Sequence, residues 1–127
     1  KFDLITCVSV LEHIVDFESA INNMFSLLNP NGYLVISFPY TEKKYIPNVY
    51  IEPESTSGQG APYVTQSFSR ENLTKWLSGN NAKIIEQEYW RFYEGGFWTS
   101  GPKTLPPTKV CVDDLHQLSC VLMQKIA

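Results

Sequence analysis

The two histidines are the side chains in this sequence that change charge closest to neutral pH. His13 follows Glu12 directly, just after an apolar run over residues 2–10. Its imidazole can accept the proton of a hydroxyl or an amine. The alternative is structural: Glu12 and His13 begin the connection to the next helix, and the imidazole is hydrogen-bonded to the backbone. The sequence alone leaves both roles open.

A second polar group, formed by Asp113, Asp114 and His116, precedes the last apolar run of the chain. Carboxylates and an imidazole at this spacing could bind a metal or act as an acid–base cluster. A solvated turn has the same composition, and we expect that structure instead. Glu52 and Glu54 are likewise expected to be solvated loop charges, so the sequence predicts no metal site.

Two apolar runs flank the segment that contains His13. Residues 2–10 and 33–38 have few polar interruptions, which is typical of strands buried on both faces of a sheet. Between them, apolar residues recur at helical spacing after the N-cap candidate Asp16, and Asn29-Pro30-Asn31-Gly32 ends that helix. The order strand, helix, strand predicts a parallel βαβ unit with a right-handed crossover.

The rest of the chain predicts one more helix and two more strands. Periodicity disappears over a long loop at residues 40–66 and returns at Ser69, the expected N-cap of a short helix. A strand is expected over residues 83–90, a second loop over 91–109 and a final strand over 118–123. The resulting division is a βαβ core (1–39), the long loop (40–66) and a helix, strand, loop and final strand (67–127).

These segments carry a resemblance to a known family. Phe2-Asp3-Leu4-Ile5, Leu11-Glu12-His13, the helix, Asn29-Pro30-Asn31-Gly32 and the second strand resemble the second half of a class I S-adenosylmethionine-dependent methyltransferase. The likeness is to the small-molecule group of type 11/23 that includes the ubiquinone-biosynthesis O-methyltransferases. It covers residues 1–39 almost end to end and is weaker over 68–90.

The resemblance implies an α/β fold. We expect a partial Rossmann-like methyltransferase fold, with a mixed sheet of about four strands (order 4-5-7-6 of the full fold) and two main helices. Asn31 stands where the family has glycine, and Asn80-Asn81 replaces an apolar turn. Asparagine tolerates the left-handed backbone that such turns need, so neither departure threatens the fold.

The resemblance also implies a site. In that family the residues leaving the first strand matched here line the methionine end of the cofactor and the point of methyl transfer. The S-adenosylmethionine contacts are therefore expected to be Cys7, Val8, Ser9, Leu11, Glu12 and His13. His13 is the catalytic candidate. Methyl transfer from a sulfonium can also proceed by in-line placement alone, which would leave His13 a positioning role.

The two long loops are rich in aromatic residues and follow strands where the family places its substrate cover. The candidate substrate residues are Tyr40, Tyr45, Trp90, Phe97 and Trp98, with further aromatics at Tyr50, Tyr89, Phe92 and Tyr93. They form either the wall of a substrate pocket or a satellite cluster that packs beneath the loops. The methyl acceptor itself stays open.

The family binds its cofactor mainly through a Gly-rich loop that has no counterpart here. Gly58-Gln59-Gly60 lies inside the long loop, with no strand before it and no helix start after it. We therefore expect a C-terminal half whose chemistry belongs to the intact protein, the chain being inactive alone. The alternative is a non-catalytic module of truncated methyltransferase fold, acting in binding or dimerisation. A nicotinamide-dependent oxidoreductase would not explain the matched motifs.

Composition limits the partners. The net charge of −3 argues against nucleic acid, and no apolar run reaches the about 20 residues of a membrane span. The three cysteines include no C-x-x-C pair, so a reducing, cytoplasmic setting is the simplest expectation. In half a fold, the strand over residues 2–10 becomes an apolar edge, and we expect self-association through it.

Overall fold

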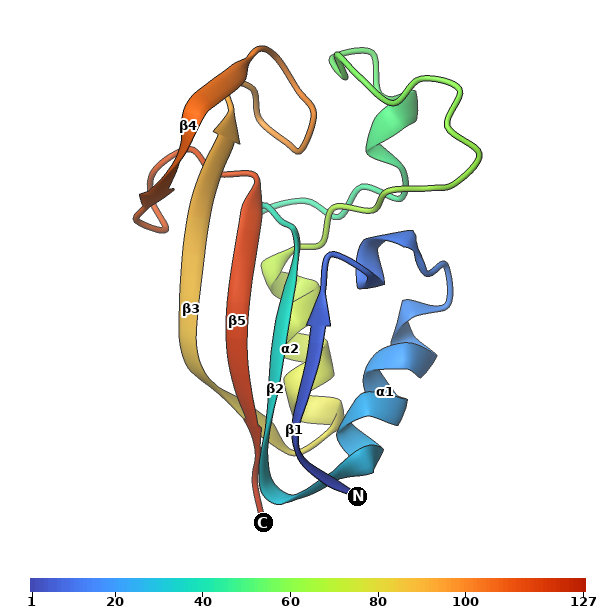
Figure 1. Cartoon of the computed structure of the whole chain (residues 1–127), viewed down its shortest axis with the longest axis vertical. Helices are drawn as coiled ribbons and strands as arrows, with labels where there is room; N and C mark the ends of the chain where they lie inside the picture. Colours follow the sequence, from blue (N-terminus) through green and yellow to red (C-terminus); the bar gives the residue numbers. More distant parts are fainter.

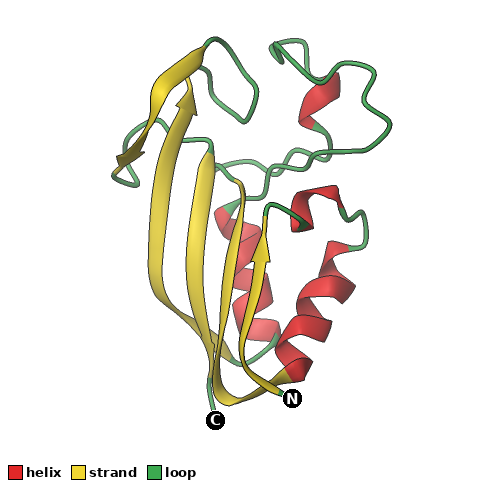
Figure 2. Ribbon diagram, in the orientation of Figure 1, coloured by secondary structure: helices red, strands yellow, loops and turns green.

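The computed structural model describes residues 1–127, which form one mixed sheet and two helices (Figure 1). The elements are β1 (Phe2–Val8), α1 (Phe17–Leu27), β2 (Leu28–Pro39), α2 (Arg70–Gly79), β3 (Ala82–Tyr93), β4 (Lys103–Val110) and β5 (Leu118–Lys125), with single 3₁₀ turns η1 (Leu11–His13) and η2 (Val49–Ile51). Figure 2 shows α1 and α2 next to each other on one side of the sheet. Neither helix is long and apolar enough to cross a membrane.

The strand order β1-β2-β5-β3-β4 confirms the predicted order of the first four neighbours. β1 and β2 are parallel, with Cys7 opposite Ile36. β5 is antiparallel to both β2 and β3, which places the last strand of the chain near the middle of the sheet. The carboxyl ends of the parallel strands β1 and β2 lie on the same side of the molecule, and the long loop begins there, after β2 (Figure 1).

The sheet has five strands, one more than the about four expected. The segment expected to be a loop over residues 91–109 contains most of β4, which pairs antiparallel with β3. Pro106 and Pro107 argued against a strand there. They are tolerated because β4 is an outer strand, where a missing backbone N–H leaves no neighbour unpaired.

The turn after α1 lies inside the bounds of β2, which begins at Leu28 rather than at residue 33. Asn31 has φ +67° and Asn81 has φ +49°, so both take the left-handed backbone expected of them. Gly32 packs closely: a Cβ there would lie 2.9 Å from the carbonyl oxygen of Asn29. The turn therefore requires glycine at this position.

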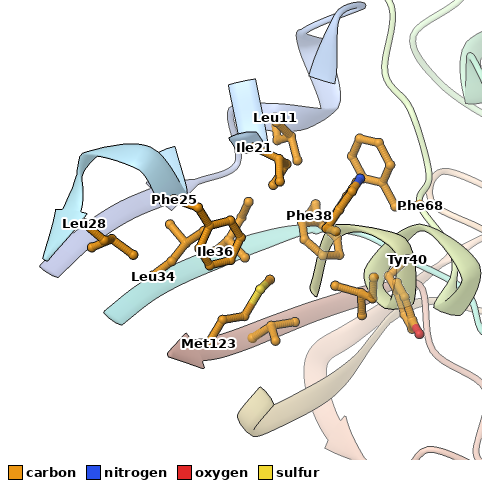
Figure 3. Packing of buried hydrophobic residues seen from close by; sticks show 13 residues of the cluster. Leu11, Ile21, Phe25, Leu28, Leu34, Ile36, Phe38, Tyr40, Phe68 and Met123 are labelled. Atoms are coloured by element: carbon orange, nitrogen blue, oxygen red, sulfur yellow. The ribbon is translucent and has the colours of Figure 1, made fainter. Parts of the chain in front are cut away.

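The core lies between the sheet and the two helices (Figure 3). Leu34, Ile36 and Phe38 of β2 and Phe25 of α1 belong to this core and are fully or almost fully buried. Phe68 joins them and makes an edge-on contact with Phe38 at 5.3 Å between ring centroids. The opposite face of the sheet has no helix over it.

The helix starts are those expected. The carboxylate of Asp16 accepts a hydrogen bond from the N–H of Ser19 at 3.3 Å. At the second helix, the backbone N–H and hydroxyl of Ser69 both donate to Oδ1 of Asn72. The first contact satisfies one of the N–H groups that a helix N-terminus leaves without a partner, and the second belongs to a capping box.

Candidate active site

The carboxyl ends of β1 and β2 lie side by side, and the predicted cofactor residues lie at the end of β1 and just after it. Ser9 has a left-handed backbone (φ 54°), and its N–H donates to the carbonyl and hydroxyl oxygens of Ser37, both at 3.2 Å. This turn takes the chain out of the sheet at the edge where open α/β sheets bind ligands. The predicted contacts comprise a half-buried Cys7, exposed Val8, Ser9 and His13, and buried Leu11 and Glu12.

Glu12 is a buried acid, with 5% of its surface exposed. Burial raises the pKa of its carboxyl group, while a backbone hydrogen bond and the charge of His13 oppose the rise. Its Oε1 atom has no hydrogen-bond partner. Burial also raises the pKa of the Cys7 thiol. The end of β1 therefore holds an acceptor that the chain itself does not satisfy.

The ring of His13 is tied to the long loop. Its Nδ1 lies 2.9 Å from the carbonyl oxygen of Val64 and 3.3 Å from Oγ1 of Thr65. A carbonyl oxygen can only accept, so Nδ1 carries the proton and Nε2 keeps its lone pair. The backbone contact of the structural alternative is present, and it leaves Nε2 able to accept a proton.

A hollow of about 460 Å³ lies beside His13. Its other lining residues are Val15, Asn48, Ala61, Pro62, Tyr63 and Val64. The Tyr63 ring meets the imidazole edge-on at 4.9 Å between centroids. In the same loop the ring of Tyr50 lies against Gly58, where a Cβ would come within 2.1 Å of it. Gly58 therefore packs against the chain itself.

A second cavity of about 520 Å³ lies beyond the end of β2, and we call it the acidic cavity. Its lining residues are Thr41, Glu42, Lys43, Lys44, Ile46, Glu52, Glu54, Gly96, Phe97, Val112, Asp113, Asp114, Leu115 and His116. The long loop, the turn before β4 and the turn after β4 all contribute to it. Side chains far apart in the sequence thus meet at one edge of the sheet.

Glu42, one of the residues that line this cavity, forms a hydrogen-bonded ion pair with Arg70. Arg70 binds Glu42 with two nitrogens, Nε to Oε2 at 3.0 Å and Nη2 to Oε1 at 2.7 Å. Arg70 also donates to Gln87 and Tyr89, and the hydroxyl of Tyr40 donates to Glu42 at 3.0 Å. Burial raises the pKa of Glu42, but hydrogen bonds from Arg70 and Tyr40 outweigh it and lower the pKa overall.

His116 does not belong to a solvated turn, and that expectation was wrong for this residue. Asp113 and Asp114 are exposed as expected, whereas His116 is 7% exposed. Its ring stacks on Tyr40, with centroids 6.0 Å apart and planes 14° apart. Gln117, which is fully buried, and then β5 follow His116, so the chain already enters the interior of the protein at this residue. These three side chains do not form a metal-ligand group.

The predicted substrate aromatics are divided among different places. Phe97 lines the acidic cavity, and Tyr40 is fully buried against His116 next to it. Tyr45 packs on Phe68 and donates its hydroxyl to Gln66. Trp98 packs on Phe92 and Tyr93 beside β4, and Trp90 is half-buried within β3. The fold does not bring these five residues into one pocket.

The sequence prediction missed Glu42 and Arg70 altogether. Glu42 stands two residues after Tyr40, and Arg70 is the first residue of α2. Nothing in their spacing relates them, because 27 residues of loop and turn separate them. No local sequence pattern indicates that these two side chains meet.

The comparisons with known proteins identify the class of this chain. The profile of a methyltransferase domain family, Methyltransf_23, matches residues 1–87. The chain therefore belongs to this methyltransferase domain family. It is also 51% identical over 37 residues to the ubiquinone biosynthesis O-methyltransferase of Histophilus somni. That stretch is 29% of this chain and 16% of that protein.

Solved structures confirm the predicted fold. A SAM-dependent methyltransferase from Methanosarcina mazei aligns with 98% of this chain (TM-score 0.53, 17% identity). A methyltransferase from Thermotoga maritima, described as a possible histamine N-methyltransferase, aligns with 98% (TM-score 0.55, 16% identity). One from Clostridium acetobutylicum aligns with 100% (TM-score 0.53, 13% identity). This chain covers 59%, 56% and 59% of those three chains, so its fold is a partial Rossmann-like methyltransferase fold.

Proposed function

We propose that this chain is part of an S-adenosylmethionine-dependent methyltransferase that acts on a small-molecule acceptor. One observation carries the proposal: in a chain of the methyltransferase family, Glu12 and His13 leave β1 at the carboxyl edge of the parallel pair. Ligands of open α/β sheets bind at that edge. The nearby cavities offer space for an acceptor beside the same strands.

The residues after β1 fit a cofactor that carries N–H donors. Oε1 of Glu12 is a buried acceptor without a partner, and an N–H donor that reaches it would relieve an unfavourable desolvation. Ser9 and His13 beside it are exposed. When bound, S-adenosylmethionine supplies a methyl group on a positively charged sulfur. Glu12 and His13 would hold its amino-acid end.

His13 would receive the proton of the acceptor. Its Nδ1 donates to the Val64 carbonyl oxygen, which fixes the ring and leaves the Nε2 lone pair for a hydroxyl or an amine. The same hydrogen bond suits a positioning role, in which His13 orients the acceptor and no proton passes. A pH–rate profile separates the two, because only a base gives a rate that falls as the imidazole becomes protonated.

The test uses the longest natural polypeptide that carries this sequence. We expect it to bind S-adenosylmethionine by calorimetry and to transfer a labelled methyl group. Glu12→Gln should weaken cofactor binding about tenfold, the effect of removing one charge-assisted hydrogen bond. Glu71→Gln, on the exposed first turn of α2, is the matched control and should change nothing. Failure of that polypeptide to bind the cofactor would contradict the proposal.

A second candidate function is self-association. β1 is an outer strand, and its side chains Phe2, Leu4 and Val8 are 56%, 56% and 59% exposed. Apolar outer strands pair readily with another chain. In this reading the chain is a non-catalytic module whose β1 pairs antiparallel with that of a second copy. Light scattering of the 127-residue chain checks it: a monomer at all concentrations rules it out.

A further inference from the structure

The acidic cavity has a strong excess of negative charge. Five carboxylates line it (Glu42, Glu52, Glu54, Asp113 and Asp114), against two lysines (Lys43 and Lys44). Of the five carboxylates, only Glu42 takes part in an ion pair, and its partner is Arg70. The other four carboxylates make no ion pair, so their charge can attract a cation that enters the cavity. A concave surface lined by one sign of charge concentrates ligands of the opposite sign.

His116 adds an independent sign of a ligand. It lines the cavity, is more than nine-tenths buried, and its Nε2 atom has no hydrogen-bond partner. Its Nδ1 lies 2.8 Å from the carbonyl oxygen of Asp114. Since that oxygen can only accept, Nδ1 holds a proton, and in the neutral imidazole Nε2 is then the acceptor. A buried acceptor of this kind calls for a donor, and neither a carboxylate nor an ether oxygen can provide one.

The ring of His116 is held in place. It stacks on Tyr40, which is itself fixed through its hydroxyl to Glu42. The imidazole also packs on Tyr89 with centroids 4.9 Å apart. The direction of the Nε2 lone pair is therefore set before a ligand arrives, which lowers the entropy cost of binding.

The remaining wall is apolar. Phe97, Ile46, Val112 and Leu115 line the same cavity. An aromatic ring and aliphatic side chains suit the hydrocarbon part of a ligand, and aromatic faces also attract ammonium groups. The cavity thus combines an anionic rim, one fixed hydrogen-bond acceptor and an apolar wall.

We propose that the acidic cavity binds a small organic ammonium ion, a primary or secondary amine on an apolar or aromatic group, whose N–H donates to Nε2 of His116. In the intact protein this ligand would be the methyl acceptor, and that further step rests on the proposed function. The binding site itself does not, because its residues are all in this chain.

The test compares three probes of similar shape on the 127-residue chain: phenethylamine, 2-phenylethanol and phenylacetate. Binding is followed by NMR chemical shifts, without S-adenosylmethionine. We expect phenethylamine to bind and to shift the signals of Phe97, Leu115 and His116. The neutral alcohol should bind at least tenfold more weakly and the anion not at all. Raising the salt concentration should weaken amine binding, since exposed charges are screened.

Two kinds of variant locate the contact. His116→Phe keeps a ring to stack on Tyr40 but removes the acceptor, and should weaken phenethylamine binding about tenfold. Glu52→Gln and Asp113→Asn change side chains at the rim that make no ion pair, so the fold survives, and each should weaken binding severalfold. Glu86→Gln, an exposed change on β3 away from the cavity, is the control.

Equal binding of the three probes, no binding of phenethylamine at millimolar concentration, or shifts confined to the hollow beside His13 would each overturn the proposal. Unchanged binding in Glu52→Gln and Asp113→Asn would do so too, even if His116→Phe did not fold. Because the cofactor is absent from this assay, its failure would leave the methyltransferase proposal standing. Conversely, amine binding would survive a failure of methyl transfer.

Discussion

Gln66 donates two hydrogen bonds to the carbonyl oxygen of Glu12, one from its backbone N–H at 2.8 Å and one from its side-chain Nε2 at 3.3 Å. The same Nε2 donates to the carbonyl oxygen of Ile14 at 2.7 Å, and Oε1 accepts from the hydroxyl of Tyr45 at 2.5 Å. The end of the long loop therefore fixes η1, which carries the candidate residues Glu12 and His13.

Gln66→Ala should destabilise the chain by about 2–3 kcal/mol, because it leaves the Ile14 carbonyl and the Tyr45 hydroxyl without their partner. Chemical denaturation measures the change. Tyr45→Phe removes only one of these hydrogen bonds and should lower the free energy of unfolding by about 1 kcal/mol. Equal losses in the two variants would show that the amide does not connect the loop to η1.

Glu12→Gln should stabilise the chain at neutral pH by about 1 kcal/mol, since it replaces a buried carboxylate that lacks a partner. The folded-state pKa of Glu12 is raised above its ordinary value of 4.5. The stability that its protonated form contributes is complete below pH 4.5 and is lost as the pH rises through the raised pKa. The gain should therefore vanish near pH 4. A constant gain at all pH values would contradict this explanation.

Arg70→Lys should cost about 1–2 kcal/mol, because lysine cannot bind Glu42 with two nitrogens and reach Gln87 and Tyr89 as well. The folded-state pKa of Glu42 is lowered, so the pair stabilises the fold above the ordinary value of 4.5 and is lost as the pH falls through the lowered pKa. Arg91→Lys is the control: its pair with Glu94 is more exposed, so its loss should have a much smaller effect on the free energy of unfolding.

Gly95→Ala should destabilise the turn before β4 by about 2 kcal/mol or more, because the new Cβ would lie 2.4 Å from the backbone oxygen of Ser100. Gly96→Ala is a matched neighbour, since a Cβ there meets nothing within 4 Å. Thermal unfolding of both variants provides the comparison. Similar melting temperatures would mean that the turn shifts freely.

Leu4→Lys tests the apolar edge of β1. Leu4 is 56% exposed and lies on the face of the sheet that has no helix, so lysine there should leave the free energy of unfolding within about 0.5 kcal/mol. If β1 mediates self-association, the variant should shift any dimer seen by light scattering to monomer. Ile85→Lys, an exposed apolar position on β3, is the control and should not.

The sequence was sufficient for the parts of the fold that depend on local patterns. The apolar runs predicted β1 and the second half of β2, Asp16 and Ser69 predicted the helix starts, and Asn31 predicted a left-handed turn. Each of these predictions depends only on residues that belong to the same strand, turn or helix start. The family motifs then supplied the strand order, because the match covers the βαβ unit that begins the sheet.

What the tertiary structure alone decided is where distant polar residues meet. β4 was missed because its prolines are unfavourable in most strands, and only its place at the edge of the sheet makes them acceptable. Glu42, Arg70 and His116 come from three separate segments, and no local pattern relates them. The sequence by itself determined which segments become strands and helices, since backbone preference and apolar period are local. The acidic cavity exists only because the fold brings the ends of those segments together in space.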